Sequence, residues 1–198
     1  MDDPQRGNFI AWYDRSRERG SNQPHFTGRL SVPGREDEHE LGVWTGKDRL
    51  NRPYFYGSID GLLITGDALT QVDQLASEQD MTAQAMDAGY NIKLAPRQFV
   101  MFANRFREPN SADTPQEAEK RARQNHFGGR LNPGDGSPVV ALAMWVKQDR
   151  NHKPMLTCST EYPRPGRDSQ VSEQEPSVDE LMAPRGGKGR RKEAEGRA

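Results

Sequence analysis

Apolar and polar residues alternate along several short stretches of this chain. Over residues 26–31, Phe26 and Leu30 fall on one face and the polar residues fall on the other. Over residues 40–45, the aliphatic residues lie opposite Trp44. Because successive side chains of a strand point to opposite faces, an alternation with a period of two predicts strands that are buried on one face. The pattern therefore indicates a mainly β protein.

The neighbouring stretches complete a small sheet. Residues 46–53 form a polar turn, and the aromatic-rich residues 54–59 return from it. Residues 9–13 supply a further strand upstream, and Pro33-Gly34 marks a turn between the second and third strands. We expect a four-stranded antiparallel β-meander, curled toward a barrel.

The meander is present twice. Residues 25–59 and 126–160 align without a gap at a constant offset of 101, with eleven identical residues. In the first copy these are His25, Phe26, Gly28, Arg29, Leu30, Leu41, Trp44, Asp48, Arg49, Pro53 and Ser58. Residues 9–18 match 99–108 at an offset of 90, so the second copy carries eleven extra residues, which fall in the polar stretch 109–124. Such self-similarity is typical of a duplicated module.

The duplication divides the chain into four parts. Two β-meander units, residues 8–60 and 98–160, are joined by residues 61–97, which we expect to form a short helical connector lying over one face of the sheets. Residues 161–198 contain few aliphatic side chains, so we expect a disordered tail, with Val178–Met182 as an apolar island that orders on a partner. The sequence leaves open whether the two units share one barrel or form two.

Composition and charge narrow the class of protein. Only 32% of the residues are hydrophobic, whereas about 45–50%, counted with Gly, is usual. Much of the chain therefore lies outside a core. The net charge is −1, so no strong overall basic field indicates nucleic acid. Residues 98–160 are mildly basic, with nine Lys and Arg against six Asp and Glu.

The absence of certain sequence features predicts the cellular location of the protein. Cys158 is the single cysteine, so an internal disulfide is excluded. No apolar run approaches the roughly 20 residues that a membrane-spanning helix needs, and the acidic N-terminus lacks the apolar stretch of a signal peptide. We expect a cytoplasmic protein without a membrane partner.

The duplicated pattern resembles a known family. The pattern is F-x-G-x-[LI], a turn, L-x-x-W, a basic polar turn and an aromatic returning strand. It is carried by Phe26, Gly28, Leu30, Leu41, Trp44, Tyr54 and Ser58, and by their counterparts from Phe127 to Ser159. It resembles small uncharacterised proteins of bacterial plasmids and phages that share a domain of unknown function. The resemblance implies an accessory protein of a mobile element and no particular activity. Met155-Leu156-Thr157 departs from it, since the first unit has aromatic residues there.

Aromatic residues are the first candidates for a binding site. Trp44 and Trp145 each share a strand face with small residues, so each indole can lie flat on the sheet. Tyr54 and Tyr56 would extend such a platform in the first unit only. Two interpretations stay open, namely packing against the rest of the protein and stacking of a nucleobase.

Two equivalent sets of basic residues, on the corresponding strands and turns of both units, are the second candidates. They are Arg29, Lys47, Arg49 and Arg52 in the first unit and Arg130, Lys147, Arg150 and Lys153 in the second. Such residues on exposed strands and turns contact phosphates. The alternative is an ordinary charged surface in which Asp48 and Asp149 partly neutralise the turns.

The sequence contains no recognisable catalytic or metal-binding pattern. His25 and His126 recur in both units, but neither has the neighbouring ligands that zinc needs, so we expect hydrogen bonds at the strand ends instead. Phosphate-binding, dinucleotide-binding and hydrolase motifs are missing, and Cys158 falls on a strand, where burial is expected. We therefore expect no cofactor, no metal and no enzyme.

Two hypotheses for function remain. The first is a non-catalytic nucleic-acid-binding accessory protein that favours single strands or the backbone. The alternative is a protein-interaction module that inhibits or adapts a host or plasmid machine, with the tail as the contact. Near-zero net charge favours the second hypothesis, and aromatic residues beside basic turns favour the first.

Overall fold

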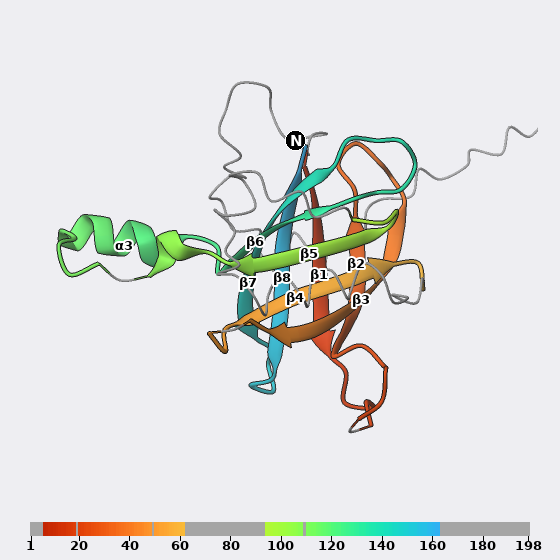
Figure 1. The fold of residues 1–198 in the computed structure, drawn as a ribbon, viewed down its shortest axis with the longest axis horizontal. Helices are drawn as coiled ribbons and strands as arrows, with labels where there is room; N and C mark the ends of the chain where they lie inside the picture. Colours follow the sequence, from red (N-terminus) through yellow and green to blue (C-terminus); the bar gives the residue numbers. More distant parts are fainter. Residues whose placement is uncertain (1–5, 19, 49, 62–93, 109, 163–198) are drawn as a thin grey trace, which may run out of the picture.

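The computed structural model describes residues 6–18, 20–48, 50–61, 94–108 and 110–162 (Figure 1). Its strands are β1 (Arg6–Tyr13), β2 (Phe26–Ser31), β3 (Glu38–Lys47), β4 (Pro53–Ile59), β5 (Gln98–Ala103), β6 (Phe127–Leu131), β7 (Val140–Gln148) and β8 (Pro154–Glu161). A short 3₁₀ helix, η1 (Arg105–Arg107), and a helix, α3 (Pro115–Arg123), lie between β5 and β6. All neighbouring strands are antiparallel, and β1 also pairs with β8, so the sheet closes into one barrel.

The register of the strands repeats between the halves. Phe9 pairs with Leu30 in the first half, and their counterparts Phe99 and Leu131 pair in the second. The two junctions between the halves, β4 with β5 and β8 with β1, are also equivalent. The predicted duplication is therefore present as an internal two-fold repeat of the strand pairing.

The expectation of two barrel-like units joined by a connector is wrong in one respect. The units do not curl separately, because four strands from each half build a single barrel. Each four-stranded half has two edge strands with unpaired backbone groups. Pairing β1 with β8 and β4 with β5 satisfies all four edges at once.

The barrel interior is filled by the side chains that the alternation of apolar and polar residues predicted to be buried. Phe26, Leu30, Leu41 and Val43 are buried inside, and so are their counterparts in the second half. An eight-stranded barrel is just wide enough for side chains to fill it. The fully buried Cys158 belongs to this core, and burial raises the pKa of its thiol well above the ordinary value, as expected for an unreactive cysteine.

Aromatic rings join the two halves inside the barrel. Phe9 and its counterpart Phe99 face each other with ring centroids 6.1 Å apart. Phe55 of the first half meets Phe127 of the second edge to face at 4.8 Å. Such pairs stabilise the structure beyond their buried area. The interior is therefore one shared core.

Gly28 and Gly129 occupy equivalent places where a neighbouring strand comes very close. A Cβ atom at Gly28 would lie 1.9 Å from the carbonyl oxygen of Ile10, and one at Gly129 would lie 2.0 Å from that of Val100. Ile10 and Val100 are themselves counterparts. The close approach of a neighbouring backbone therefore accounts for the glycine in both halves.

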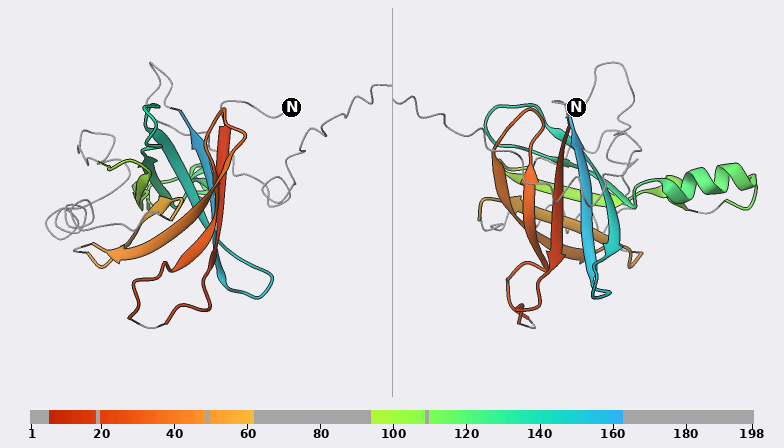
Figure 2. Two further views of the ribbon diagram at one scale, coloured as in Figure 1. Left: turned by 90° about the vertical axis from the view of Figure 1, so that its right-hand side faces the viewer. Right: turned by 180° about the vertical axis from the view of Figure 1, so that it is seen from behind.

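The polar insertion of the second half contains a helix that the sequence analysis did not predict. α3 has no buried residue and extends away from the barrel wall (Figure 2). Thr114 and Glu117 form a reciprocal capping box at its start, and this Thr-x-x-Glu pattern was the available sequence signal. Arg107 donates to the carbonyl oxygens of Ala122 and Gln124, so η1 holds the end of the helix. We call residues 104–125 the α3 arm.

Two predictions fall outside the described residues. The helical connector concerns mainly residues 62–93, and the disordered tail concerns 163–198. Within the described ranges, no helix has both the length and the apolar character needed to cross a bilayer.

Candidate nucleic-acid interface

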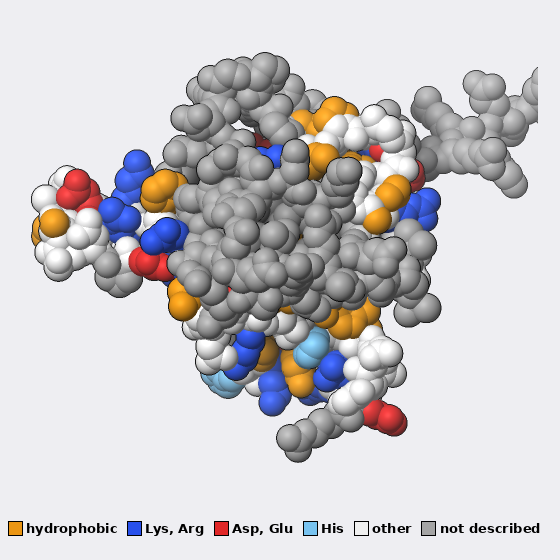
Figure 3. All heavy atoms as spheres, in the orientation of Figure 1, with side chains coloured by type: hydrophobic (Ala, Val, Ile, Leu, Met, Phe, Trp, Pro, Cys, Tyr) orange, Lys and Arg blue, Asp and Glu red, His pale blue; other side chains and the backbone are white. Residues whose placement is uncertain are grey.

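The antiparallel meander brings the loops after β1, β3, β5 and β7 to one end of the barrel. These loops are residues 14–25, 47–53, 104–126 and 147–153. Their described residues include twelve Lys and Arg but only eight Asp and Glu. We call this region the basic end. In Figure 3, Lys, Arg and His side chains gather at the lower edge of the molecule, where the β3–β4 and β7–β8 hairpins turn.

The opposite end has the reverse charge. It is formed by residues 32–40, 60–61, 94–97 and 132–139. The described residues there include two Lys and Arg and six Asp and Glu. We call it the acidic end. A polyanion that approaches the barrel is therefore attracted to one end and repelled from the other.

Two equivalent aspartates build the hairpin turns of the basic end. Asp48 Oδ1 accepts from the backbone N–H of Arg52 at 2.8 Å, and Asp149 Oδ1 accepts from that of Lys153 at 2.9 Å. The hydrogen bond from Lys153 is the main reason why the pKa of Asp149 lies below its ordinary value. Because both carboxylates accept equivalent backbone hydrogen bonds, the two turns have the same backbone support.

A left-handed residue completes each turn. Asn51 has φ 62° and its counterpart His152 has φ 58°. Asn and His tolerate this conformation better than most residues. The two hairpin turns therefore have the same backbone conformation at this position.

The predicted basic residues of these turns have different roles. Lys47, Arg150 and Lys153 are exposed. Arg52 forms an ion pair with the buried carboxylate of Asp48, with Nε and Oδ2 2.7 Å apart, so it supports the turn. Arg49 lies outside the described residues. The topology thus joins the turn residues of both halves at one end, which the sequence alone did not predict.

Arg29 and Arg130 lie apart from that end, on the barrel wall. The side chain of Arg29 is 50% exposed and pairs with Glu38 at 3.2 Å. Arg130 is its counterpart on β6 and is partly buried. A surface pair such as Arg29–Glu38 contributes only about 0.2–1 kcal/mol, so it leaves Arg29 able to change partners.

The aromatic candidates of the first half do meet on the outer wall. Trp44 and Tyr56 are stacked, with ring centroids 6.2 Å apart and planes at 10°. The Trp44 indole N–H donates to the carbonyl oxygen of Asn22 at 3.0 Å. Trp44 and Tyr56 are partly exposed, whereas Tyr54 is buried between Tyr56 and Phe102. The predicted platform therefore consists of two accessible rings on a buried third.

Trp145 makes the same indole hydrogen bond as its counterpart Trp44, but it is less exposed to solvent. Its indole N–H donates to the carbonyl oxygen of Arg123 at 3.4 Å, the position equivalent to Asn22. The residue is only 3% exposed. For Trp145 the packing interpretation therefore holds, and a role in stacking a base is not available to it in this structure.

The two repeated histidines hold strand ends. Nδ1 of His25 accepts from the N–H of Thr45 at 3.3 Å, and Nδ1 of His126 accepts from that of Val146 at the same distance. Burial, and then the charge of Arg17, lower the pKa of His25 below its ordinary value. The predicted strand-end hydrogen bond is confirmed. Among the described residues, no three His, Cys, Asp or Glu side chains are placed to share a metal ion.

Sequence reasoning missed two features of this region. One is the α3 arm, which belongs to the basic end. The other is Trp12, which points outward from β1 and is partly exposed, opposite the inward Ala11. Residues 9–13 are all apolar or aromatic, so no alternation of polar and apolar residues indicated the face of Trp12. Comparison with known proteins adds no further guide, because no protein-family model, no curated protein and no solved structure matches this chain.

Proposed function

We propose that this protein is a non-catalytic nucleic-acid-binding protein that holds the phosphate backbone at its basic end. The observation that carries the proposal is the convergence of two equivalent basic hairpins at one end of the barrel. Lysine and arginine on exposed turns are the usual partners of phosphate oxygens. The acidic opposite end supports the proposal because it orients an approaching polyanion.

The residues of the basic end divide into contacts and supports. Lys47, Arg150 and Lys153 are exposed and would meet phosphates. Asp48 and Asp149 would keep the two turns in shape before the ligand arrives. A preformed turn lowers the cost of ordering side chains on binding.

Salt dependence of binding to a labelled single-stranded DNA tests the proposal. Each phosphate that the protein neutralises releases counterions, with a slope of log affinity against log salt of roughly −0.7 per contact for single strands. Replacing Arg150 and Lys153 by Gln should reduce the slope by roughly 1 to 1.5. Arg97→Gln, at the acidic end, is the matched control and should leave the slope unchanged. Affinity that is absent, or that ignores salt, contradicts the proposal.

A protein-interaction module is the second candidate. The observation in its favour is the presence of Glu38 and Glu40 beside Arg29, since carboxylates on the wall repel phosphates and suit a basic peptide. It is supported if the full chain shifts no oligonucleotide at low salt and loses a defined protein partner when residues 161–198 are removed.

A further inference from the structure

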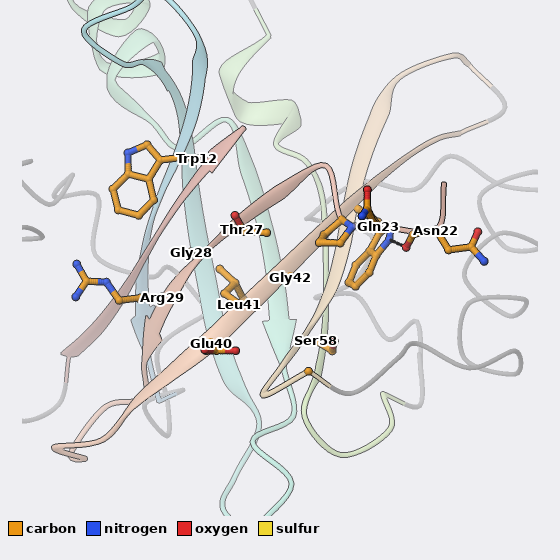
Figure 4. A pocket seen from close by; sticks show the side chains of 13 residues that line it. Trp12, Asn22, Gln23, Thr27, Gly28, Arg29, Glu40, Leu41, Gly42 and Ser58 are labelled. Atoms are coloured by element: carbon orange, nitrogen blue, oxygen red, sulfur yellow. Dashed lines mark hydrogen bonds between the residues drawn. The ribbon is translucent and has the colours of Figure 1, made fainter. Parts of the chain in front are cut away.

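An open groove crosses the outer wall of the first half of the barrel. Its volume is about 890 Å³, within the roughly 300–1,000 Å³ of typical ligand sites. Figure 4 shows Trp12 on one side of the groove and Asn22 and Gln23 on the other, with Thr27 and Gly42 between them. The groove therefore extends over several strands of the first half and one loop.

Gly42 and Trp44 give the groove an ordered aromatic wall. A Cβ atom at Gly42 would lie 3.1 Å from the Trp44 ring, so the indole lies directly over the glycine. Tyr56 stacks on the ring, and the carbonyl oxygen of Asn22 accepts its N–H. The ring is thus fixed before any ligand binds, which reduces the entropy cost of stacking against it.

The equivalent surface of the second half is closed. Ala143 stands in place of Gly42, and Phe102 in place of Trp12, and both are buried. Trp145 makes the same hydrogen bond as Trp44 but is buried too. The second half therefore shows that the barrel can close without an open groove on its outer wall. The groove is a property of the first half alone.

Polar groups lie between the aromatic walls. Thr27, Arg29, Glu40 and Ser58 line the groove and supply both donors and acceptors. Flat aromatic walls with mixed donors and acceptors suit the faces and edges of nucleobases. The carboxylate of Glu40 is unfavourable for phosphate, so the groove fits bases better than it fits backbone.

The groove begins at the basic end and extends along the wall to Glu40 and Gly61 of the acidic end. Residues 22–24 belong to the β1–β2 loop, which forms one wall of the groove and part of the basic end. A strand whose phosphates lie on the basic end can therefore turn its bases into the groove. We propose that the groove holds unpaired bases, so that the ligand class of this protein is single-stranded nucleic acid rather than duplex. This inference rests on the proposed function.

The test compares two strands of equal length and charge. The probes are a labelled oligothymidine and an abasic oligonucleotide that keeps the phosphates and lacks the bases. Stacking on an aromatic ring favours a base by roughly 5-fold to more than 100-fold. We expect oligothymidine to bind about tenfold more tightly than the abasic strand, and also more tightly than the same sequence in a duplex.

Variants of the groove should remove the preference without removing phosphate binding. Trp44→Ala should lower affinity for oligothymidine about tenfold and leave affinity for the abasic strand unchanged, and Trp44→Phe should keep most of the preference. Gly42→Val displaces the indole without deleting it and should act like Trp44→Ala. The barrel tolerates a side chain at this position, since the second half carries Ala143 there. Val139→Ala, at an apolar residue that is 39% exposed on the acidic end, is the control and should change neither affinity.

The outcomes separate the two proposals. Equal affinity for both strands overturns the groove inference and leaves backbone binding intact. Equal weakening of both strands by Trp44→Ala and Gly42→Val also overturns it, because the residues would then act on the fold or the backbone. If neither strand binds, both proposals fail, and a groove that instead binds a basic peptide identifies the second candidate function.

Discussion

The two halves of the barrel share their inner faces and differ on their outer ones. Phe9, Phe26 and Leu30 have buried counterparts that pair in the same register. On the outer wall, Trp44 is partly exposed over Gly42, whereas Trp145 is buried beside Ala143. Residues that close the barrel were therefore kept in both copies, and the outer wall was free to diverge.

The difference separates requirements of folding from requirements of binding. The backbone hydrogen bonds of Asp48 and Asp149 occur in both halves and support the fold of the two turns. A feature present in one half, such as the groove, needs another explanation. The internal repeat therefore supplies a control for each residue within the same molecule.

The largest expected effect tests whether the two tryptophans differ in burial. Trp145→Ala removes a buried side chain and should lower the free energy of unfolding by about 3–5 kcal/mol. Trp44→Ala should cost less, about 1–2 kcal/mol, because that residue is partly exposed in the folded protein. Urea unfolding followed by circular dichroism measures both. Equal costs would mean that the two outer walls are alike.

The second prediction tests whether the halves are equivalent at the closest backbone contact. Gly28→Ala and Gly129→Ala should each lower the free energy of unfolding by about 3 kcal/mol, since the added Cβ meets a carbonyl oxygen that cannot move aside. Thermal unfolding of the two single variants gives the comparison. A tolerated substitution in one half alone would break the symmetry of the barrel.

The third prediction concerns the turns. Asp48→Ala should lower the free energy of unfolding by about 2 kcal/mol, because Asp48 is buried and its backbone partners would be left unsatisfied. Asp149→Ala should cost less, because its side chain is more exposed, at 22%. Chemical denaturation of both variants measures the difference. The reverse order would contradict the assignment of burial in the two hairpins.

The smallest effect is a dependence on pH. Burial lowers the pKa of His25 below the ordinary value of 6.5, so the unfolded chain binds the proton more readily than the folded one. The contribution to stability is complete above pH 6.5 and is lost as the pH falls below it. Unfolding of the native protein and of His25→Asn between pH 7.5 and 5 should show a weaker dependence in the variant. A variant that follows the native curve would exclude His25 as the source.

Much of the barrel could be predicted from the sequence, because strand alternation and duplication are local patterns. The inward faces of Phe26 and Leu41 follow from them, and so does the equivalence of Gly28 and Gly129. The closure of one barrel did not, because pairing of β1 with β8 depends on residues more than a hundred positions apart. For the same reason the placement of the two basic turns at one end of the barrel was not predicted.

The candidate residues divide in a similar way. The sequence predicted that Trp44 and Tyr56 belong to one aromatic platform on adjacent strands, and the two rings are stacked in the structure. The burial of Trp145 was not, since its strand pattern matches that of Trp44 and only the three-dimensional surroundings differ. The resemblance to plasmid and phage proteins, and the mobile-element role that it implies, stay predictions.

The matching junctions β4–β5 and β8–β1 have a consequence for the origin and assembly of the protein. An ancestral chain with a single copy of the meander would have carried two free edges, and the last strand of one molecule would have been the complement of the first strand of a second molecule. Two such chains would have closed as a homodimer before gene fusion joined them. A present-day chain cut between β4 and β5 should reassemble from its two fragments when they are mixed, and a ribosome-bound chain cannot close the barrel until its last strand has emerged.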